Sequence, residues 1–394
     1  MSRIAVFRQK AGSLQLIALQ FFSLAGVGIV SPYVNVYLSD LEFSGVLIGT
    51  LASLGAILSL IITPVFTLIA DRRLLHRRLL MLYLTGFALA NFLFASTQAQ
   101  ILVIVAVLLI KVTVSPSLTL GMQLTMALLI QSKKVILGKV RAFASLGFAL
   151  ASLIAGTLIA AGGYPLLFSI GVIFALVSIQ MATVFPDRPK GKAPADTAPK
   201  QPRNRGFYVL ALCQFFVTIG TYNSYSFLYI HLRDHLGVNA TDVGIWAALL
   251  AAAEIPILYL LDFILPKLRV RVVYIFSILG IGLFTLSLGM VQSLPALALL
   301  LVLRGIVWPC FHLSSFRLVN AISQPRNAAT NQAILQVTMP STALLLTGSL
   351  FGWTFDNLGS SAFFALCALA CLAGMCIVIA GFRLFDVRNC AERT

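Results

Sequence analysis

The feature that most constrains this chain is a series of twelve runs of about 20 predominantly apolar residues, separated by short polar gaps. Hydrophobic residues make up 59% of the sequence and charged residues only 10%, against about 25% charged in soluble domains. A chain this apolar cannot hide its surface from water by folding on itself, whereas each run is long enough to span a bilayer. We therefore predict an all-α integral membrane protein with twelve transmembrane helices, near residues 13–38, 44–70, 77–97, 99–121, 140–162, 164–186, 207–233, 241–264, 271–291, 293–316, 327–353 and 359–384.

The cations are concentrated in alternate gaps. Of the 28 Lys and Arg residues, 25 lie in the two tails and in every second gap between the runs. The intervening gaps carry acidic residues, and Arg233 is their single cation. Because positive charge accumulates on the cytoplasmic side of membrane proteins, we predict a multi-pass protein of the bacterial inner (plasma) membrane with both termini in the cytoplasm.

Charge and cysteine usage exclude several other classes. The net charge of +16 is spread over thin segments rather than gathered on one face, so we expect the lipid bilayer as a partner and no nucleic acid. The six cysteines show no disulfide framework, metal-ligand spacing or redox motif, so neither a metal nor a cofactor is expected. The sequence has no pattern typical of a catalytic triad, a paired-carboxylate site or a nucleotide-binding loop, so we expect neither an enzyme nor an ATP-driven pump.

A Pro-rich, basic linker divides the chain. Residues 187–206 contain almost no apolar side chains, which is typical of a flexible cytoplasmic linker. It separates an N-terminal six-helix half, 1–186, from a C-terminal half, 207–394. A Gln-Phe-Phe motif opens the first run of each half, at 20–22 and 214–216. Two related halves are the arrangement of parallel-repeat transporters, which work by alternating access.

Small residues recur four apart on two of the predicted helices. The first set lies in the run 44–70 and the second in the run 140–162: Gly45, Gly49 and Ser53, then Gly147, Ala151 and Ala155. This spacing lets two helix backbones approach closely, either where one helix slides on another or in ordinary tight packing.

The sequence resembles a known family at several motifs. Ala70-Asp71-Arg72-Arg73 is similar to the signature loop of the major facilitator superfamily, although Thr67 stands where a Gly is usual. Gly138-x-x-Arg141, followed by Ser145-x-Gly147-Phe148, resembles the phenylpropionate permease branch, which is related to the oligosaccharide:proton symporters. Glu254-Ile255-Pro256 and Phe311-His312 resemble the same branch. The resemblance implies a transporter in which Asp71, Arg72 and Arg141 take part in gating.

Away from the ends of the hydrophobic runs, four residues are charged or a histidine and so are candidates to lie in the hydrocarbon: Lys111, Glu254, Arg304 and His312. Charged groups at the centre of a membrane helix cost about 2.5 to 3.5 kcal/mol on insertion scales, so each is a candidate functional residue. The alternative is a buried pin, in which the charge pairs with another group and fixes the helices. Glu254 is the only deeply placed acid, and we expect it to carry the proton if transport is proton-coupled.

An excess of cations in the membrane interior predicts an anionic substrate. Lys111, Arg304 and His312 are candidate ligands for a small organic carboxylate, such as an aromatic carboxylate. Polar and aromatic residues on the first and seventh runs are further candidate ligands, unless they only join helices: Gln20, Asn35, Gln214, Tyr222 and Tyr225. The alternatives are a neutral sugar or nucleoside:proton symporter and a non-transporting membrane sensor on the same fold. We expect a monomer.

Overall fold

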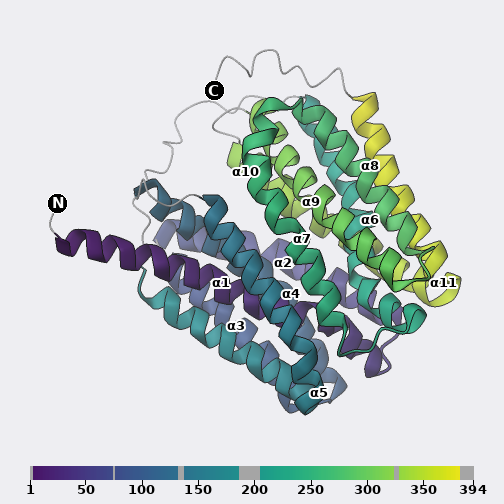
Figure 1. The fold of residues 1–394 in the computed structure, drawn as a ribbon, viewed down its shortest axis with the longest axis horizontal. Helices are drawn as coiled ribbons and strands as arrows, with labels where there is room; N and C mark the ends of the chain where they lie inside the picture. The colour runs from purple at the N-terminus through teal and green to yellow at the C-terminus, as the bar shows by residue number, and fades with distance from the viewer. Residues whose placement is uncertain (1–2, 74–75, 132–136, 186–204, 324–327, 382–394) are drawn as a thin grey trace. The chain divides into compact units, whose positions relative to one another are not determined.

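The computed structural model describes residues 3–73, 76–131, 137–185, 205–323 and 328–381, and all regular structure in these ranges is helical (Figure 1). Eight of the helices in these ranges are long and apolar enough to cross a membrane. The predicted all-α membrane architecture is therefore confirmed. The helices are α1 (Arg3–Asp40), α2 (Gly45–Arg73), α3 (His76–Ser96), α4 (Gln100–Gln131), α5 (Leu137–Thr183), α6 (Arg205–Leu236), α7 (Val243–Ile264), η1 (Leu265–Lys267), α8 (Val270–Leu288), α9 (Leu294–Ile322), α10 (Ala328–Ala333), η2 (Ile334–Thr338) and α11 (Met339–Ala380).

Two of these helices are each two predicted runs joined at a glycine. The backbone of α5 leaves helical geometry at Gly162 and Gly163, between the predicted runs 140–162 and 164–186. The backbone of α11 does so at Gly359, where the last predicted run begins. Gly163 and Gly359 have φ of 68° and 78°, which a residue without a Cβ adopts at little cost.

The described chain forms two compact units. The first contains α1, α2 from Leu58 onward, α3, α4, α5, the end of α6 from Leu232, and α7 up to Tyr259. The second contains the start of α2 up to Ile57, most of α6, and α8 to α11. The division of the chain at a linker over 187–206 stays a prediction, because residues 187–204 of this segment lie outside the described residues.

The first unit is built on close contact between α1 and α5. A Cβ atom added to Gly147 would overlap the backbone oxygen of Phe21, and one added to Gly28 would lie 2.8 Å from the Cα atom of Phe148. Ala151 and Ala155 on the same face of α5 are buried. The predicted close approach along this small-residue face is therefore confirmed, since bulkier residues would push the helices apart.

Arg233, the single cation among the predicted acidic gaps, ties the end of α6 to the end of α1 in the first unit. Its guanidinium group pairs with Asp40 at the end of α1 and donates to Asp234 at 2.7 Å and to the hydroxyl of Ser39 at 2.8 Å. The hydroxyl of Tyr164, beside the kink of α5, donates to the second oxygen of Asp40 at 2.5 Å. A planar group with five N–H donors suits a site where several acceptors converge.

The second unit brings the start of α2 against α11. A Cβ atom added to Gly49 would overlap the carbonyl oxygen of Gly348, and the hydroxyl of Ser53 donates to the backbone oxygen of Leu344 at 2.8 Å. The carboxylate of Asp356 accepts hydrogen bonds from the N–H groups of Gly45 and Val46, at 2.9 and 3.0 Å. The small-residue prediction on α2 is thus confirmed as well.

Many apolar side chains lie on the outside of the units. Ile101, Leu299 and Leu346 are 77%, 72% and 64% exposed. In water such a surface would be costly, whereas hydrocarbon solvates it. Their exposure agrees with a protein that is surrounded by lipid.

Candidate functional site

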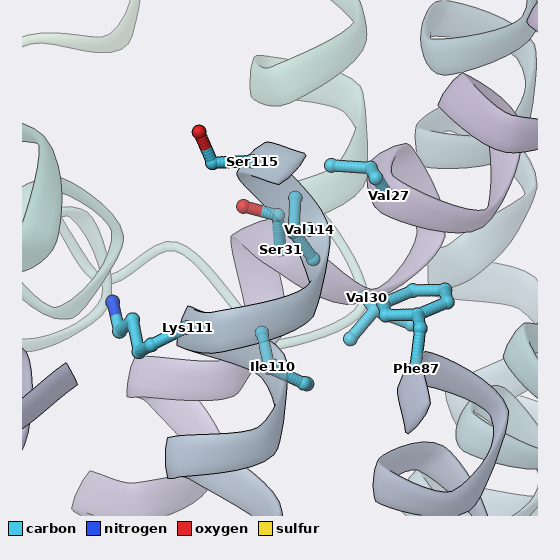
Figure 2. A pocket seen from close by; sticks show the side chains of 8 residues that line it. All are labelled: Val27, Val30, Ser31, Phe87, Ile110, Lys111, Val114 and Ser115. Atoms are coloured by element: carbon cyan, nitrogen blue, oxygen red, sulfur yellow. The ribbon is translucent and has the colours of Figure 1, made fainter. Parts of the chain in front are cut away.

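A pocket of about 200 Å³ lies inside the first unit, beside Lys111 of α4 (Figure 2). Its walls come from α1, α3 and α4 and are mostly apolar: Val27, Val30, Ser31, Phe87, Ile110, Lys111, Val114 and Ser115. In Figure 2 the polar ends of Lys111, Ser31 and Ser115 lie to the left, while the ring of Phe87 lies to the right. The pocket thus has a polar side and an apolar side.

Helical periodicity places these side chains in one pocket. Lys111 and Ser115 are four residues apart on α4, and Val27 and Ser31 are four residues apart on α1, so each pair lies on one helix face. The hydroxyl of Ser59 donates to the backbone oxygen of Lys111 at 3.1 Å and joins α2 to this turn of α4. The side chain of Lys111 is left to face the pocket.

The ammonium group of Lys111 has no carboxylate beside it in the described part of the chain. The residues that line the pocket include no acid, and no ion pair of Lys111 is present among the described residues. An ion pair would have indicated a pin between helices. An ammonium group that faces a pocket without a counter-charge can instead attract an anion from solution.

Arg304 of α9 lies in the second unit in an aromatic environment. It is 8% exposed, and its guanidinium carbon is 3.9 Å from the ring centroid of Trp308 and 5.9 Å from that of Phe284. His312, one turn beyond Trp308 on α9, meets the same indole edge-on at 4.3 Å. A guanidinium group over an indole face is a favourable cation–π contact, so Trp308 holds both predicted ligands on one face of α9.

The other predicted ligands do not line the Lys111 pocket. Gln20 is 4% exposed, and its amide lies 3.0 Å from where a Cβ of Gly121 would stand. Gln214 is also buried, and its amide donates to the hydroxyl of Thr218 on the same helix at 3.5 Å. The surroundings of both amides are thus those of helix-packing residues, the alternative weighed from the sequence.

The remaining predicted ligands and the coupling acid have mixed environments. Asn35 of α1 and Glu254 of α7 are half-buried, and Tyr222 of α6 is 36% exposed. The ring of Tyr225 meets that of Tyr229 edge-on at 5.8 Å. These four residues do not form one cluster, and no ligand-binding role follows from their positions.

The predicted gating residues fall at the edge of the described part. Asp71 and Arg72 are at the end of α2 and Arg141 is near the start of α5, but their side chains lie outside the described residues. Among the residues whose side chains are described, no group of three His, Cys, Asp or Glu could hold a metal ion. Five cysteines in these ranges are free thiols.

Sequence reasoning missed Ser31, Phe87 and Ser115, which line the pocket. A signal existed for Ser115, because it follows Lys111 by four residues and so shares its helix face. Phe87 had no signal of this kind, since only the packing of α3 against α4 brings it to the pocket.

Comparison with known proteins identifies the family. No curated protein matches the sequence. A crystal structure of a mutant of the nucleoside transporter NupG is similar, with a TM-score of 0.77 and 17% identity over 95% of this chain and 100% of that one. A bacterial homologue of the human lysosomal transporter Spinster has a TM-score of 0.69 and 15% identity, with 98% of each chain covered.

The human organic anion transporter MFSD10 has a TM-score of 0.67 and 14% identity, over 94% of this chain and 99% of that one. At such identities these likenesses establish the fold. Residues 13–366 match the family described as MFS_1 like. The chain therefore belongs to the MFS_1 like family, and so to the transporters of the major facilitator superfamily rather than to enzymes.

Proposed function

We propose that this protein is a secondary active transporter that carries a small organic anion, such as an aromatic carboxylate, across the membrane by alternating access. The observation that supports the proposal most is the ammonium group of Lys111, which faces a mostly apolar pocket with no acid in its lining. A pocket with one cation and apolar walls selects an amphipathic ligand with one negative charge.

The dimensions and chemistry of the pocket fit such a ligand. Its volume of about 200 Å³ compares with roughly 150 Å³ for an apolar cavity that binds benzene, which leaves room for one carboxylate group. The ring of Phe87 and the side chains of Val27 and Val30 would cover an aromatic body. Lys111 would bind the carboxylate, and the hydroxyls of Ser31 and Ser115 are additional donors on the same side.

The cycle that we propose rests on the two sequence halves. The halves 1–186 and 207–394 rock about the site, with Asp71, Arg72 and Arg141 gating on the cytoplasmic side. Arg304 and His312 remain candidate substrate ligands of the C-terminal half. Transport would be a symport with protons. The protein would act as a monomer in the bacterial inner membrane, with both termini in the cytoplasm.

Similar structures suggest the competing substrates. They include a nucleoside transporter, an organic anion transporter and a POT family transporter in complex with 5-aminolevulinic acid. Nucleosides are neutral, so a nucleoside site would gain nothing from the cation at Lys111, whereas a carboxylate site needs it. We therefore favour the carboxylate over a nucleoside or a sugar.

A thermal-shift screen of the purified protein tests the proposal. Benzoate, 3-phenylpropionate, a neutral sugar and uridine would be added at pH 5.5 and 7.5, because a ligand that binds the native state raises its melting temperature. We expect stabilisation by the carboxylates, lost in Lys111→Met and kept in Leu102→Met, a matched change on the exposed face of α4.

Stabilisation by uridine or the sugar alone, unchanged in Lys111→Met, would refute the carboxylate proposal. Benzoate uptake into proteoliposomes then separates a transporter from a sensor, which would bind the ligand without moving it.

A further inference from the structure

Building on the proposed function, we propose that Lys111 itself carries the coupling proton: its ammonium form crosses paired with the substrate carboxylate, and its neutral amine crosses alone. The same side chain would then provide both substrate recognition and proton coupling. This assignment differs from the one based on sequence, which placed the proton on Glu254.

Lys111 supplies the only charge in the lining of the pocket. Glu254 is not one of the eight residues that line it. The nearest segment of α2, residues 58–66, contains no titratable side chain, and neither does the rest of α4 from Gln100 to Leu118. No neighbouring group described in this region can therefore balance the ammonium charge.

The other two helices around the pocket also carry titratable residues. On α1, Tyr33 accepts a hydrogen bond from the N–H of Gly244 at 2.8 Å, Tyr37 packs among aromatic rings, and Asp40 pairs with Arg233. On α3, Tyr83 lies one turn from Phe87 with its ring against Phe66. His76, Arg77 and Arg78 lie at least nine residues from Phe87, or about 13 Å along the helix. None of these residues lines the pocket.

The cost of moving the site across the membrane depends on its charge. A lone cation in the hydrocarbon is disfavoured, so a carrier with an empty pocket and a charged Lys111 would change conformation slowly. A bound carboxylate removes the net charge, and so does loss of the proton. Lysine can lose its proton in such a site, whereas the guanidinium group of an arginine cannot.

The resulting cycle balances charge and protons. On one side, the neutral amine of Lys111 takes up one proton and one carboxylate, and the pair crosses without net charge. On the other side, the carboxylate and the proton leave, and the neutral amine returns. One proton therefore moves with each carboxylate, and the transport is electroneutral.

Replacement of Lys111 by arginine separates the two roles. In Lys111→Arg the carboxylate still binds, but the guanidinium group cannot lose its proton. The empty carrier therefore stays positively charged. We expect exchange of radiolabelled benzoate for internal benzoate to stay within a few-fold of the wild-type rate. Net uptake should be about 100-fold slower than in the wild type, because the free-energy cost of a lone charge in the membrane corresponds to roughly a factor of 100 in rate. Leu102→Met, on the exposed face of α4, is the matched control and should keep net uptake, and Glu254→Gln tests the alternative carrier.

Each outcome decides the assignment. Net uptake by Lys111→Arg at the wild-type rate would overturn the proton-carrier role and leave the proposed function intact. If Glu254→Gln keeps exchange but loses proton influx, the assignment is also overturned. Absence of benzoate exchange by the wild type would instead refute the proposed function itself.

If the Lys111→Arg protein does not fold, a second measurement tests the same assignment without it. Proton influx per benzoate would be measured with a pH-sensitive dye inside wild-type and Glu254→Gln proteoliposomes, without a membrane potential. One proton per benzoate in both proteins supports Lys111 as the carrier, and loss of this ratio in Glu254→Gln refutes it.

Discussion

The close approach of α2 and α11 gives a prediction with a matched control inside the same unit. A Cβ atom on Gly49 would overlap the carbonyl oxygen of Gly348, a backbone atom that no side-chain rotation can move away. A Cβ atom on Gly282 of α8 would meet its nearest neighbour, a flexible leucine side chain, at 3.4 Å. Both glycines are within helices, so Gly49→Ala and Gly282→Ala gain the same helix propensity, about 1 kcal/mol.

The difference between the two variants isolates the helix contact. Overpacking costs about 1 to 3 kcal/mol, and the upper half of that range applies because the obstructing atom is backbone. With an unfolding entropy of about 2.1 cal/mol/K per residue, a chain of 394 residues shifts by about 1 °C per kcal/mol, so Gly49→Ala should melt roughly 2 to 4 °C below Gly282→Ala. Thermal unfolding of both proteins in one detergent provides the measurement. Equal melting temperatures would refute the close approach of the two helices.

Three further changes test other contacts by thermal unfolding. Arg233→Ala should cost about 1 kcal/mol, because its partners Asp40 and Asp234 are partly exposed, and the loss should shrink in 1 M salt; a salt-independent loss would contradict an ion pair. Asp356→Ala should cost about 1 kcal/mol through loss of the cap on α2, and Asp356→Asn, which keeps one of the two acceptor oxygens, should cost less; equal losses would count against capping. Trp308→Leu should cost about 2 to 4 kcal/mol and Trp308→Phe less, since a ring still faces the guanidinium group; the reverse order would exclude a cation–π contact.

Much of the fold could be predicted because hydrocarbon leaves the chain few options. Backbone groups in a bilayer must be satisfied within the segment, so a run of about 20 apolar residues is a helix. The interruptions of α5 at Gly162 and of α11 at Gly359 also lie at the borders of predicted runs. The sequence around each glycine has the composition of a turn. Helix ends were less predictable: α9 continues to Ile322, six residues beyond the predicted run, because a helix can extend past the hydrocarbon.

The candidate site was predictable only in part. Lys111 was found from sequence because a charge in an apolar run is costly wherever the helix packs. Phe87 and Ser31 could not be found, because they become neighbours of Lys111 only through the packing of α1 and α3 around α4. Gln20 and Gln214 are buried, and their role as ligands stays a prediction, since a polar stripe on a membrane helix looks the same whether it faces a ligand or another helix.

The sequence by itself determined the all-α membrane class, the helix positions and the residues whose charge demands an explanation, because hydropathy and charge act locally along the chain. Tertiary structure decided what those residues touch. It placed Lys111 at a pocket without an acid in its lining, Arg304 on the ring of Trp308, and Arg233 between the ends of α1 and α6. The physical reason is that the role of a buried charge depends on its partners, and partners distant in sequence are chosen by packing.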